Sequence, residues 1–514
     1  MIIEKSRNNI KYLIFVPLLI YIGKRSLIAF DEGFYAMQAR WIIEKSNWVG
    51  PLFWDQVSSD RTIGIQFLIA ISKKLFGDSL FVIYIPIILA AILMLYCTFQ
   101  LHKELLEDKN PIYSALILST TFLWINYAHM ATQDIVFSSL ISLGILSSIK
   151  SYKTHNKFQL LLSGSWIGLA VMLKTYLTAI PLIALFPFLI SSKIIFRRYF
   201  WIGFSLGFLP FILWSYQYIS IYSFETYSGM FEKLIRLSKK NSFTNPFYYY
   251  FWNFSINIFP WSIPSLIGFF QASKLKNISK YFLFFYPICI IFLLSLFSTK
   301  TPYYPIQTLS LVSLNSYIGI KYLIDNNNNK LTYYIEKINY FCIPILIFTS
   351  ILILSFSEKI TIDERAKICI FIGVGLFTFF WLNYIIINSQ KRKLNFSILG
   401  AYLLVLFIVQ SGLITDKSKD FRIAIETIIK REELRNYSVE VIKSEASNDE
   451  SFSKIIKIMV KTPKLGKGLN NLSELGSNNY AWTTTDVKKK RELENYRIIN
   501  EDQIFYPWKL IYKR

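Results

Sequence analysis

Cysteine and histidine are scarce in this chain, which has four cysteines and three histidines among its 514 residues. The cysteines all lie inside apolar segments, without any Cys-x-x-Cys spacing, at Cys97, Cys289, Cys342 and Cys369. We interpret them as small buried hydrophobic residues, not as disulfides or metal ligands. The histidines are scattered along the chain, so the sequence contains no histidine-based metal cluster.

Acidic residues are few as well: 33 Asp and Glu stand against 56 Lys and Arg, which gives a formal net charge of +23. In a soluble protein such an excess would favour a nucleic-acid partner, but no basic helix or finger motif accompanies it here. The basic residues cluster in short connections between apolar segments. We therefore interpret the charge as topogenic and as contact with anionic lipid headgroups, and expect no nucleic-acid partner.

Apolar residues dominate the remainder, with 53% hydrophobic residues, 17% aromatic residues and a mean hydropathy of +0.37. Repeated stretches of membrane-spanning length predict an all-α polytopic membrane protein. No small-residue cleavage site follows the first stretch, so we interpret it as a membrane helix and not as a signal peptide. The sequence predicts about thirteen transmembrane helices, near residues 10–28, 80–101, 112–128, 134–149, 160–173, 176–190, 199–219, 249–270, 281–298, 303–324, 338–355, 368–387 and 396–414.

The basic connections predict the orientation of these helices. Residues 160–190 could form one long helix around Lys174, but the basic groups at 150–157 and 193–198 both indicate cytoplasmic connections, which requires two crossings between them. The amino terminus is then cytoplasmic. Lys24-Arg25, at the outer end of the first helix, runs against this rule.

The predicted topology divides the chain into a membrane domain, residues 1–414, and a polar soluble domain, residues 415–514, on the outer face. The first outer loop, residues 29–79, contains two stretches of helical apolar spacing, 34–43 and 63–76, which indicate amphipathic helices at the membrane interface. The soluble domain is predicted to be a small α/β or α+β domain with helices at 420–433 and 453–460 and strands at 437–442, 480–484 and 508–512.

Carboxylates gather on the same predicted outer face, where Asp31-Glu32 and Asp60 lie in the first loop and Asp134 opens a membrane helix. The alternative for Asp31-Glu32 is a helix N-cap with an acidic first turn. Ionisable residues at membrane depth usually serve a function, however, and this favours a shared site. One carboxylate could act as a general base, while Asp31, Asp60 and Asp134 are candidate ligands of a divalent metal ion.

Four basic side chains on this face, those of Arg40, Arg61, Lys174 and Lys300, could instead contact phosphate oxygens directly. For the two lysines the alternative is snorkelling at a helix end. Tyr303 and Tyr304 follow Lys300-Thr301-Pro302 and could line a lipid groove, although anchoring in an interfacial aromatic belt is the alternative for single aromatic residues.

The start of the first outer loop, Asp31-Glu32-Gly33-Phe34-Tyr35, resembles that of the polyprenyl-phosphate-sugar-dependent membrane glycosyltransferases of the GT-C fold, which include protein O-mannosyltransferases and lipid A aminoarabinose transferases. Similar motifs follow in the family's order over roughly the first 310 residues. They are Asn47-Trp48-Val49-Gly50-Pro51, Lys74-Leu75-Phe76-Gly77, Ala131-Thr132-Gln133-Asp134, Met172-Leu173-Lys174-Thr175 and Lys300-Thr301-Pro302-Tyr303-Tyr304-Pro305. The soluble outer domain is more similar to the aminoarabinose transferase branch.

Two departures from that branch stand out. Where it usually has an acidic residue followed by Lys-Pro-Pro, this chain has Ser59-Asp60-Arg61-Thr62-Ile63, which keeps an acid and a base and lacks the two prolines. No match to the family's histidine in a later outer loop is found, which leaves the metal open.

The resemblance implies an inverting glycosyltransferase on the outer face of a bacterial inner membrane, with a polyprenyl-phosphate sugar donor and a lipid, glycan or protein acceptor. Asp31, Glu32, Asp60 and Asp134 would be its catalytic carboxylates. Arg61, Lys174, Lys300, Tyr303 and Tyr304 would bind the donor phosphate and its lipid. A divalent metal ion is the one cofactor left open. The alternative is a secondary transporter with coupling carboxylates, against which the sequence shows no inverted repeat.

Overall fold

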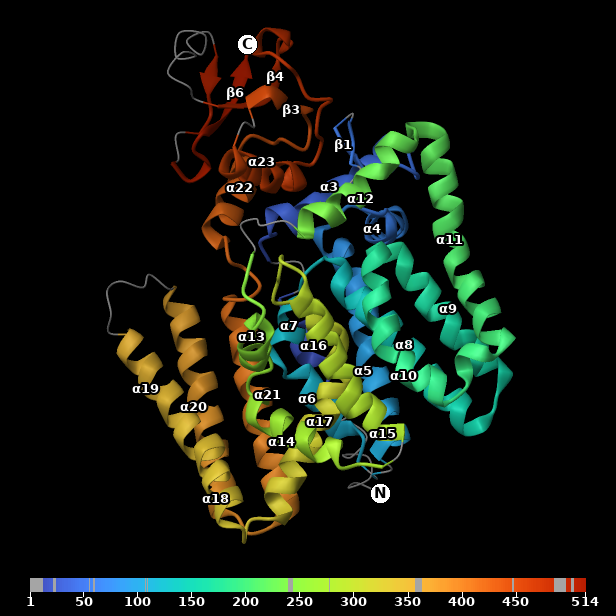
Figure 1. Ribbon diagram of the computed structural model, residues 1–514. Helices are drawn as coiled ribbons and strands as arrows, with labels where there is room; N and C mark the ends of the chain where they lie inside the picture. Colours follow the sequence, from blue (N-terminus) through green and yellow to red (C-terminus); the bar gives the residue numbers. More distant parts are fainter. Residues whose placement is uncertain are drawn as a thin grey trace, which may run out of the picture. The chain divides into compact units, whose positions relative to one another are not determined.

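The computed structural model describes residues 13–21, 25–54, 56–58, 61–106, 108, 110–238, 244–276, 278–355, 363–445, 448–484, 496–500 and 503–514 (Figure 1). The chain divides into two compact units. The membrane unit consists of Met1–Ile22, Ser59–Gly64 and Tyr84–Ile414, and the loop–tail unit consists of Gly23–Ser58, Ile65–Ile83 and Thr415–Arg514. Most of the first outer loop thus belongs to the same compact unit as the tail. The domain boundary predicted from the sequence, between a membrane domain ending at residue 414 and a soluble domain, stays a prediction.

The described part of the membrane unit is helical. Its longer helices are α5 (Ile85–Leu106), α8 (Gln133–Thr154), α9 (Lys157–Lys174), α10 (Ala179–Ser191), α11 (Arg198–Tyr222), α12 (Phe224–Ser238), α14 (Ser262–Ser273), α16 (Tyr286–Leu296), α17 (Leu309–Asp325), α19 (Ile343–Ser355), α20 (Glu364–Ile386) and α21 (Gln390–Ser411). Its shorter elements are α2 (Val16–Leu19), α6 (Ile112–Ser119), α7 (Phe122–Ala128), η3 (Thr175–Thr178), η4 (Ile194–Phe196), α13 (Tyr249–Asn257), α15 (Ile278–Lys280), η5 (Tyr281–Phe285), η6 (Tyr304–Thr308), α18 (Lys330–Lys337) and η7 (Ile338–Cys342).

Eight helical segments among the described residues are long and apolar enough to cross a membrane. They are Leu80–Leu106, Gln133–Thr154, Lys157–Ser191, Arg198–Tyr222, Ile278–Leu296, Lys330–Ser355, Glu364–Ile386 and Gln390–Ser411. The predicted class, an all-α polytopic membrane protein, is confirmed. The predicted number of thirteen helices stays a prediction.

Interrupted helices account for much of the difference in number. The predicted helix 112–128 is split into α6 and α7 at Thr120-Thr121, and the predicted helix 249–270 is split into α13 and α14. The segment Lys157–Ser191, counted once above, contains the two helices α9 and α10, because Thr175 adopts a positive φ of 41° that ends α9 before η3 begins. The predicted first helix, 10–28, lies partly outside the described residues. The helix α12 was not predicted, and it lies between the predicted helices 199–219 and 249–270.

Small residues hold α9 tightly against α11, and the two helices run side by side in Figure 1. Gly164 and Gly168 of α9 meet the backbone of α11, and Gly203 and Gly207 of α11 meet the backbone of α9. This is the small-xxx-small pattern of close helix packing in membranes. It fixes the helix that carries Lys174 at its carboxyl end.

The loop–tail unit combines helices with short strands. Its elements are η1 (Ala29–Gly33), α3 (Phe34–Glu44), β1 (Leu52–Phe53), β2 (Gln56–Val57), α4 (Gly64–Phe76), η2 (Leu80–Tyr84), α22 (Lys419–Arg431), β3 (Val439–Val441), η8 (Lys443–Glu445), α23 (Asp449–Lys461), η9 (Leu472–Glu474), β4 (Asn479–Thr484), β5 (Arg497–Ile498), η11 (Gln503–Phe505) and β6 (Trp508–Lys513). Four strands form one sheet in the order β3-β4-β6-β5, with β3 parallel to β4 and the other pairs antiparallel. A small strand-containing domain is therefore confirmed.

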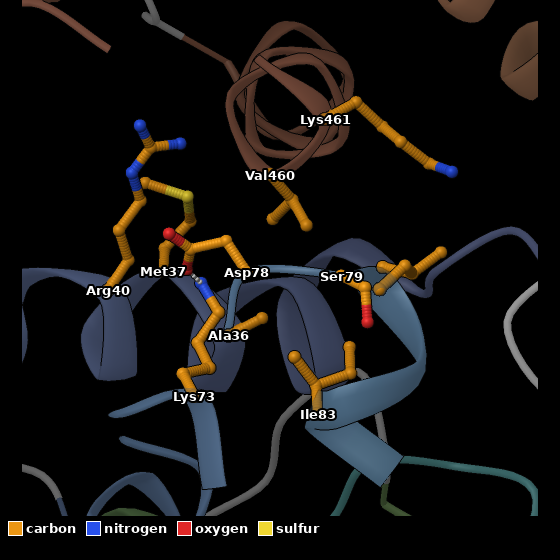
Figure 2. A pocket seen from close by; sticks show the side chains of 10 residues that line it. Ala36, Met37, Arg40, Lys73, Asp78, Ser79, Ile83, Val460 and Lys461 are labelled. Atoms are coloured by element: carbon orange, nitrogen blue, oxygen red, sulfur yellow. Dashed lines mark ion pairs between the residues drawn. The ribbon is translucent and has the colours of Figure 1, made fainter. Parts of the chain in front are cut away.

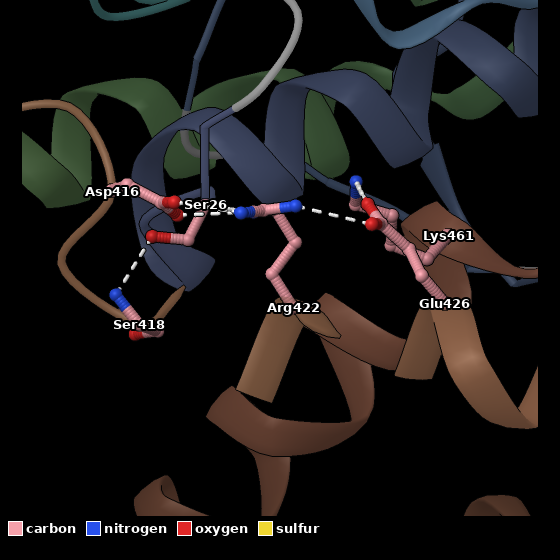
Figure 3. A network of polar contacts seen from close by, with 6 residues as sticks. All are labelled: Ser26, Asp416, Ser418, Arg422, Glu426 and Lys461. Carbon is pink, nitrogen blue, oxygen red and sulfur yellow. Dashed lines mark hydrogen bonds and ion pairs between the residues drawn. The ribbon is translucent and has the colours of Figure 1, made fainter. Parts of the chain in front are cut away.

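One hydrophobic core joins the first loop to the tail. Met37 and Trp41 of α3 pack in the same cluster as Ile425 of α22, Ile458 of α23 and Trp508 of β6. One polar contact crosses this junction: the Ser418 N–H donates to the hydroxyl of Ser26 at 2.8 Å (Figure 3). Two ion pairs beside it hold the tail itself together, Arg422 with Asp416 at 2.9 Å and Lys461 of α23 with Glu426 of α22 at 2.7 Å. The loop and the tail thus fold as one body.

Candidate functional site

Asp31 and Glu32 lie in η1, a single π-helical turn. Neither of them is the N-cap of the following helix α3, because that position is occupied by Gly33. Asp31 is partly exposed, whereas Glu32 is completely buried. The Glu32 carboxylate pairs with the equally buried guanidinium of Arg25 at 2.8 Å and accepts the Ile28 N–H at 3.0 Å. Glu32 therefore holds the turn in shape, while the neighbouring Asp31 stays partly exposed.

Helix α23 of the tail packs directly against this turn. A Cβ atom added at Gly33 would lie 2.7 Å from Cγ2 of Ile456, a side chain that is fully buried. Phe30 stacks on Phe452 of the same helix at 6.1 Å between ring centroids. Gly33 is thus required for close approach of the turn to α23, and the tail sets the position of the carboxylates.

A second polar cluster lies in the membrane unit, where the amino end of α8 meets the carboxyl end of α9. Lys174 Nζ lies 2.5 Å from one oxygen of Asp134, and the Thr132 hydroxyl donates to the other oxygen at 2.9 Å. Both charged side chains are buried, with exposed fractions of 6% and 7%. Lys174 does not snorkel: its charge is kept inside the protein by a carboxylate, as intramembrane charges require.

Aromatic rings enclose this ion pair. The Lys174 ammonium lies 5.6 Å from the ring centroid of Tyr303, 5.4 Å from that of Tyr304 and 5.3 Å from that of Phe137. Tyr127 packs on Tyr303 at 5.2 Å. Ring faces attract a cation, so the tyrosines stabilise the ammonium in addition to Asp134. Tyr303 and Tyr304 of the motif after Lys300 are thereby placed at Lys174.

Two further predicted cations belong to the same unit. Arg61 is followed by Thr62, whose hydroxyl donates to the Leu173 carbonyl at 3.2 Å, so this segment lies against the end of α9. The Lys300 ammonium donates to the carbonyls of Asn245 at 2.9 Å and Phe297 at 2.5 Å. These acceptors are neutral, so they leave the lysine charge uncompensated, and burial lowers the pKa of Lys300.

The structure thus brings Asp134, Lys174, Tyr303 and Tyr304 together in the membrane unit, and it places Asp31 and Glu32 in the loop–tail unit. Asp60 lies outside the described residues. Among the residues that are described, no group of three or more His, Cys, Asp or Glu side chains could hold a metal ion. Both oxygens of the candidate ligand Asp134 are already engaged, by Lys174 and Thr132.

Sequence reasoning missed Arg25 and Thr132 as members of these clusters. The signal for Arg25 was present, since this residue violates the charge rule at the outer end of the first helix. A basic residue on the outer side, close in sequence to Asp31-Glu32, indicates an ion-pair partner for one of these two carboxylates.

The sequence comparisons point to glycosyltransferases. The family described as dolichyl-phosphate-mannose-protein mannosyltransferase matches residues 60–216. An undecaprenyl phosphate-alpha-4-amino-4-deoxy-L-arabinose arabinosyl transferase of Edwardsiella ictaluri is 26% identical over 243 residues, 45% of this chain and 44% of that protein. A protein of the same name from Yersinia pestis is 26% identical over 181 residues, 34% of this chain and 33% of its own length. The chain thus spans less than half of these relatives.

The structural comparison covers nearly the whole chain. Crystal structures of ArnT from Cupriavidus metallidurans match it with a TM-score of 0.76 in complex with undecaprenyl phosphate and of 0.75 in the apo state. The first match covers 97% of this chain and 96% of ArnT at 12% identity, and the second covers 99% and 98% at 10% identity. The chain therefore has the fold of ArnT, and both the predicted resemblance and the predicted GT-C fold are confirmed. These comparisons give the transporter alternative no support.

Proposed function

We propose that this chain is a membrane glycosyltransferase that takes a hexose or pentose from a polyprenyl-phosphate donor and transfers it to a lipid, glycan or protein acceptor. The observation that carries the proposal is the buried Lys174–Asp134 pair with Tyr303 and Tyr304 around it. Both charged residues lie within residues 60–216, the part of the chain that matches the mannosyltransferase family. A buried cation under aromatic rings suits the phosphate and the lipid of such a donor.

The chemistry requires a base and a stabilised leaving group. An acceptor hydroxyl or amine attacks the anomeric carbon, the bond from this carbon to the donor phosphate breaks, and the polyprenyl phosphate leaves with an added negative charge. We assign the acceptor proton to Asp31, the more exposed of the two carboxylates of η1. Lys174, Arg61 and Lys300 are assigned to the phosphate, where positive charge stabilises the leaving group. Asp134 pairs with Lys174 and orients its side chain.

The direction of the chain in the membrane follows from its basic connections. We place the donor chemistry and the tail on the periplasmic side of a bacterial inner membrane, because the alternate connections with clustered lysines are retained in the cytoplasm. A divalent metal ion could contribute further positive charge beside the donor phosphate. Asp31 and Asp60 then remain the candidate ligands, since Asp134 is held by Lys174.

The proposal predicts donor turnover by the purified full-length chain. In detergent, with labelled undecaprenyl-phosphate sugars (4-amino-4-deoxy-L-arabinose and mannose) and a bacterial outer-membrane lipid extract as acceptor, we expect label to move to the acceptor and free undecaprenyl phosphate to be formed. The measurement is thin-layer separation of donor and product. Accumulation of an intact solute by sealed proteoliposomes, with no donor cleaved under any of these conditions, would instead establish the transporter.

A second prediction concerns the packing of α23 on η1. Gly33→Ala introduces the Cβ atom that collides with Ile456, so the turn must shift and Asp31 with it. A shift of about 1 Å at a catalytic group can cost up to a hundredfold in rate, and we expect a loss of tenfold or more. Ile456→Ala removes the colliding Cγ2 atom, so the double variant should regain activity relative to Gly33→Ala.

The matched control is Gly375→Ala in α20, where an added Cβ meets no atom within 4 Å. It should transfer sugar at the wild-type rate. Equal rates for Gly33→Ala and wild type, with the protein folded, would remove the tail from the positioning of Asp31.

A further inference from the structure

A pocket of about 140 Å³ opens in the loop–tail unit, and Asp31 is not among the residues that line it (Figure 2). Arg40 of α3, Lys73 of α4, Ile83 of η2 and Lys461 of α23 line it, together with Asp78 and Ser79 from the connection after α4. Arg40 lies about two turns beyond Gly33 along α3. The volume is several times the roughly 30 Å³ of one water molecule, so a phosphate group fits.

Partly buried cations are paired with exposed carboxylates around this pocket. Lys73 is 11% exposed and its partner Asp78, at 3.1 Å, is 87% exposed. Lys461 is 15% exposed and its partner Glu426, at 2.7 Å, is 46% exposed. Arg40 is 11% exposed and its partner Glu44, at 2.6 Å, is 42% exposed. The positive charges therefore have fixed places, while each carboxylate can turn into solvent at little cost, as surface ion pairs allow.

Arg40 is the most firmly held of the three cations. Its guanidinium donates to the carbonyls of Thr462 at 2.7 Å and Pro463 at 3.0 Å, at the end of α23. Arg40 thus keeps its charge at the rim even when Glu44 moves away. Burial lowers the pKa of Lys73, Arg40 lowers it further, and Asp78 opposes both effects. An anion with more charge than one carboxylate would stabilise the Lys73 ammonium better than Asp78 does.

An apolar rim beside the pocket indicates the source of such an anion. Leu75, Phe76 and Phe81 flank Asp78 in the sequence and are 69%, 63% and 45% exposed. The helix α4 that ends here is amphipathic, as interfacial helices are. Exposed aromatic and aliphatic side chains next to a basic pocket suit a molecule that carries both acyl chains and a charged headgroup, and basic pockets of membrane proteins bind anionic lipids.

We propose that this pocket binds the phosphate group of an anionic membrane lipid, with Lys73 as the direct ligand in place of Asp78 and Arg40 as a fixed second charge. Lys461, now bound to Glu426, contributes from α23 when the lipid arrives. The acyl chains lie along Leu75, Phe76 and Phe81. The site shares no residue with the donor cluster at Lys174, and it is proposed independently of the transferase activity.

The test is equilibrium binding of labelled dioleoyl phosphatidic acid to the purified full-length protein in detergent, without any sugar donor. Lys73→Gln should raise the Kd about tenfold or more, since a charged hydrogen bond is lost. Lys74→Gln is the matched control: it removes the same charge from the adjacent, exposed lysine, which does not line the pocket, and should leave the Kd unchanged. Asp78→Asn removes the competing carboxylate and should lower the Kd about threefold.

Each result decides the proposal. Equal Kd values for Lys73→Gln and Lys74→Gln, or weaker binding by Asp78→Asn, would overturn it. Displacement of the lipid by millimolar inorganic phosphate as readily as by unlabelled lipid would show a site for a soluble anion and refute the lipid. A loss of folding in Lys73→Gln would not blur the outcome, because the tighter binding of Asp78→Asn cannot arise from misfolding.

Discussion

Replacing Asp31 with asparagine is expected to lower the rate of sugar transfer about a hundredfold to ten-thousandfold, the usual contribution of a positioned general base. The substitution keeps the size of the side chain and one acceptor oxygen, and it removes the negative charge. Asp31 is partly exposed and lies beside Glu32, whose carboxylate holds the turn through Arg25 and Ile28, so the fold should survive. The measurement is the initial rate with the labelled donor, together with the unfolding temperature.

Two variants in the same unit separate this effect from others. Asp449→Asn makes the identical change at an exposed position in the first turn of α23 and should leave the rate unchanged. Glu32→Gln should instead lower the stability of the protein. It leaves the buried Arg25 guanidinium without its carboxylate, which typically costs about 3–5 kcal/mol of folding free energy. A folded Asp31→Asn protein that transfers sugar at the wild-type rate would assign Asp31 a purely structural role.

Local spacing in the sequence predicted several elements closely. The predicted interfacial helices at 34–43 and 63–76 are α3 (Phe34–Glu44) and α4 (Gly64–Phe76), and the predicted strand at 480–484 is β4 (Asn479–Thr484). These elements follow from amphipathic or alternating patterns that a short window contains. The same patterns do not reveal a partner. Helix α3 shares a hydrophobic core with the tail through Met37 and Trp41. This packing depends on contacts between residues some four hundred positions apart, which a short sequence window does not contain.

Charge pairs were the least predictable part of the site. Lys174 and Asp134 were both selected as candidates, but nothing in the spacing of their helices indicated a direct contact. Lys393 lies beside Lys391 and Arg392 in the connection between the predicted helices 368–387 and 396–414, and it is buried in an ion pair with Glu336 at 3.0 Å. A basic residue near a helix end can therefore have either of two roles: it can orient the helix in the membrane, or it can form an ion pair inside the protein. Only tertiary structure distinguishes them.

The buried Lys174–Asp134 pair allows stability and activity to be separated. Lys174→Met alone leaves a buried carboxylate without its cation, and Asp134→Asn alone leaves a buried ammonium without its carboxylate, so each should cost about 3–5 kcal/mol of folding free energy. The double variant carries neither charge and should recover most of the unfolding temperature. If Lys174 stabilises the leaving phosphate, the double variant should nevertheless transfer sugar about a hundredfold to a thousandfold more slowly than wild type.

The matched control is the second buried pair of the membrane unit, Lys393–Glu336, whose side chains are 7% and 6% exposed. Lys393→Met with Glu336→Gln removes a comparable pair that has no assigned contact with the donor, so this double variant should keep both its stability and its transfer rate. Full activity in Lys174→Met with Asp134→Asn would show that this ion pair only joins α8 to α9. The donor phosphate would then rest on Arg61 and Lys300, the cations that Asp134 does not neutralise.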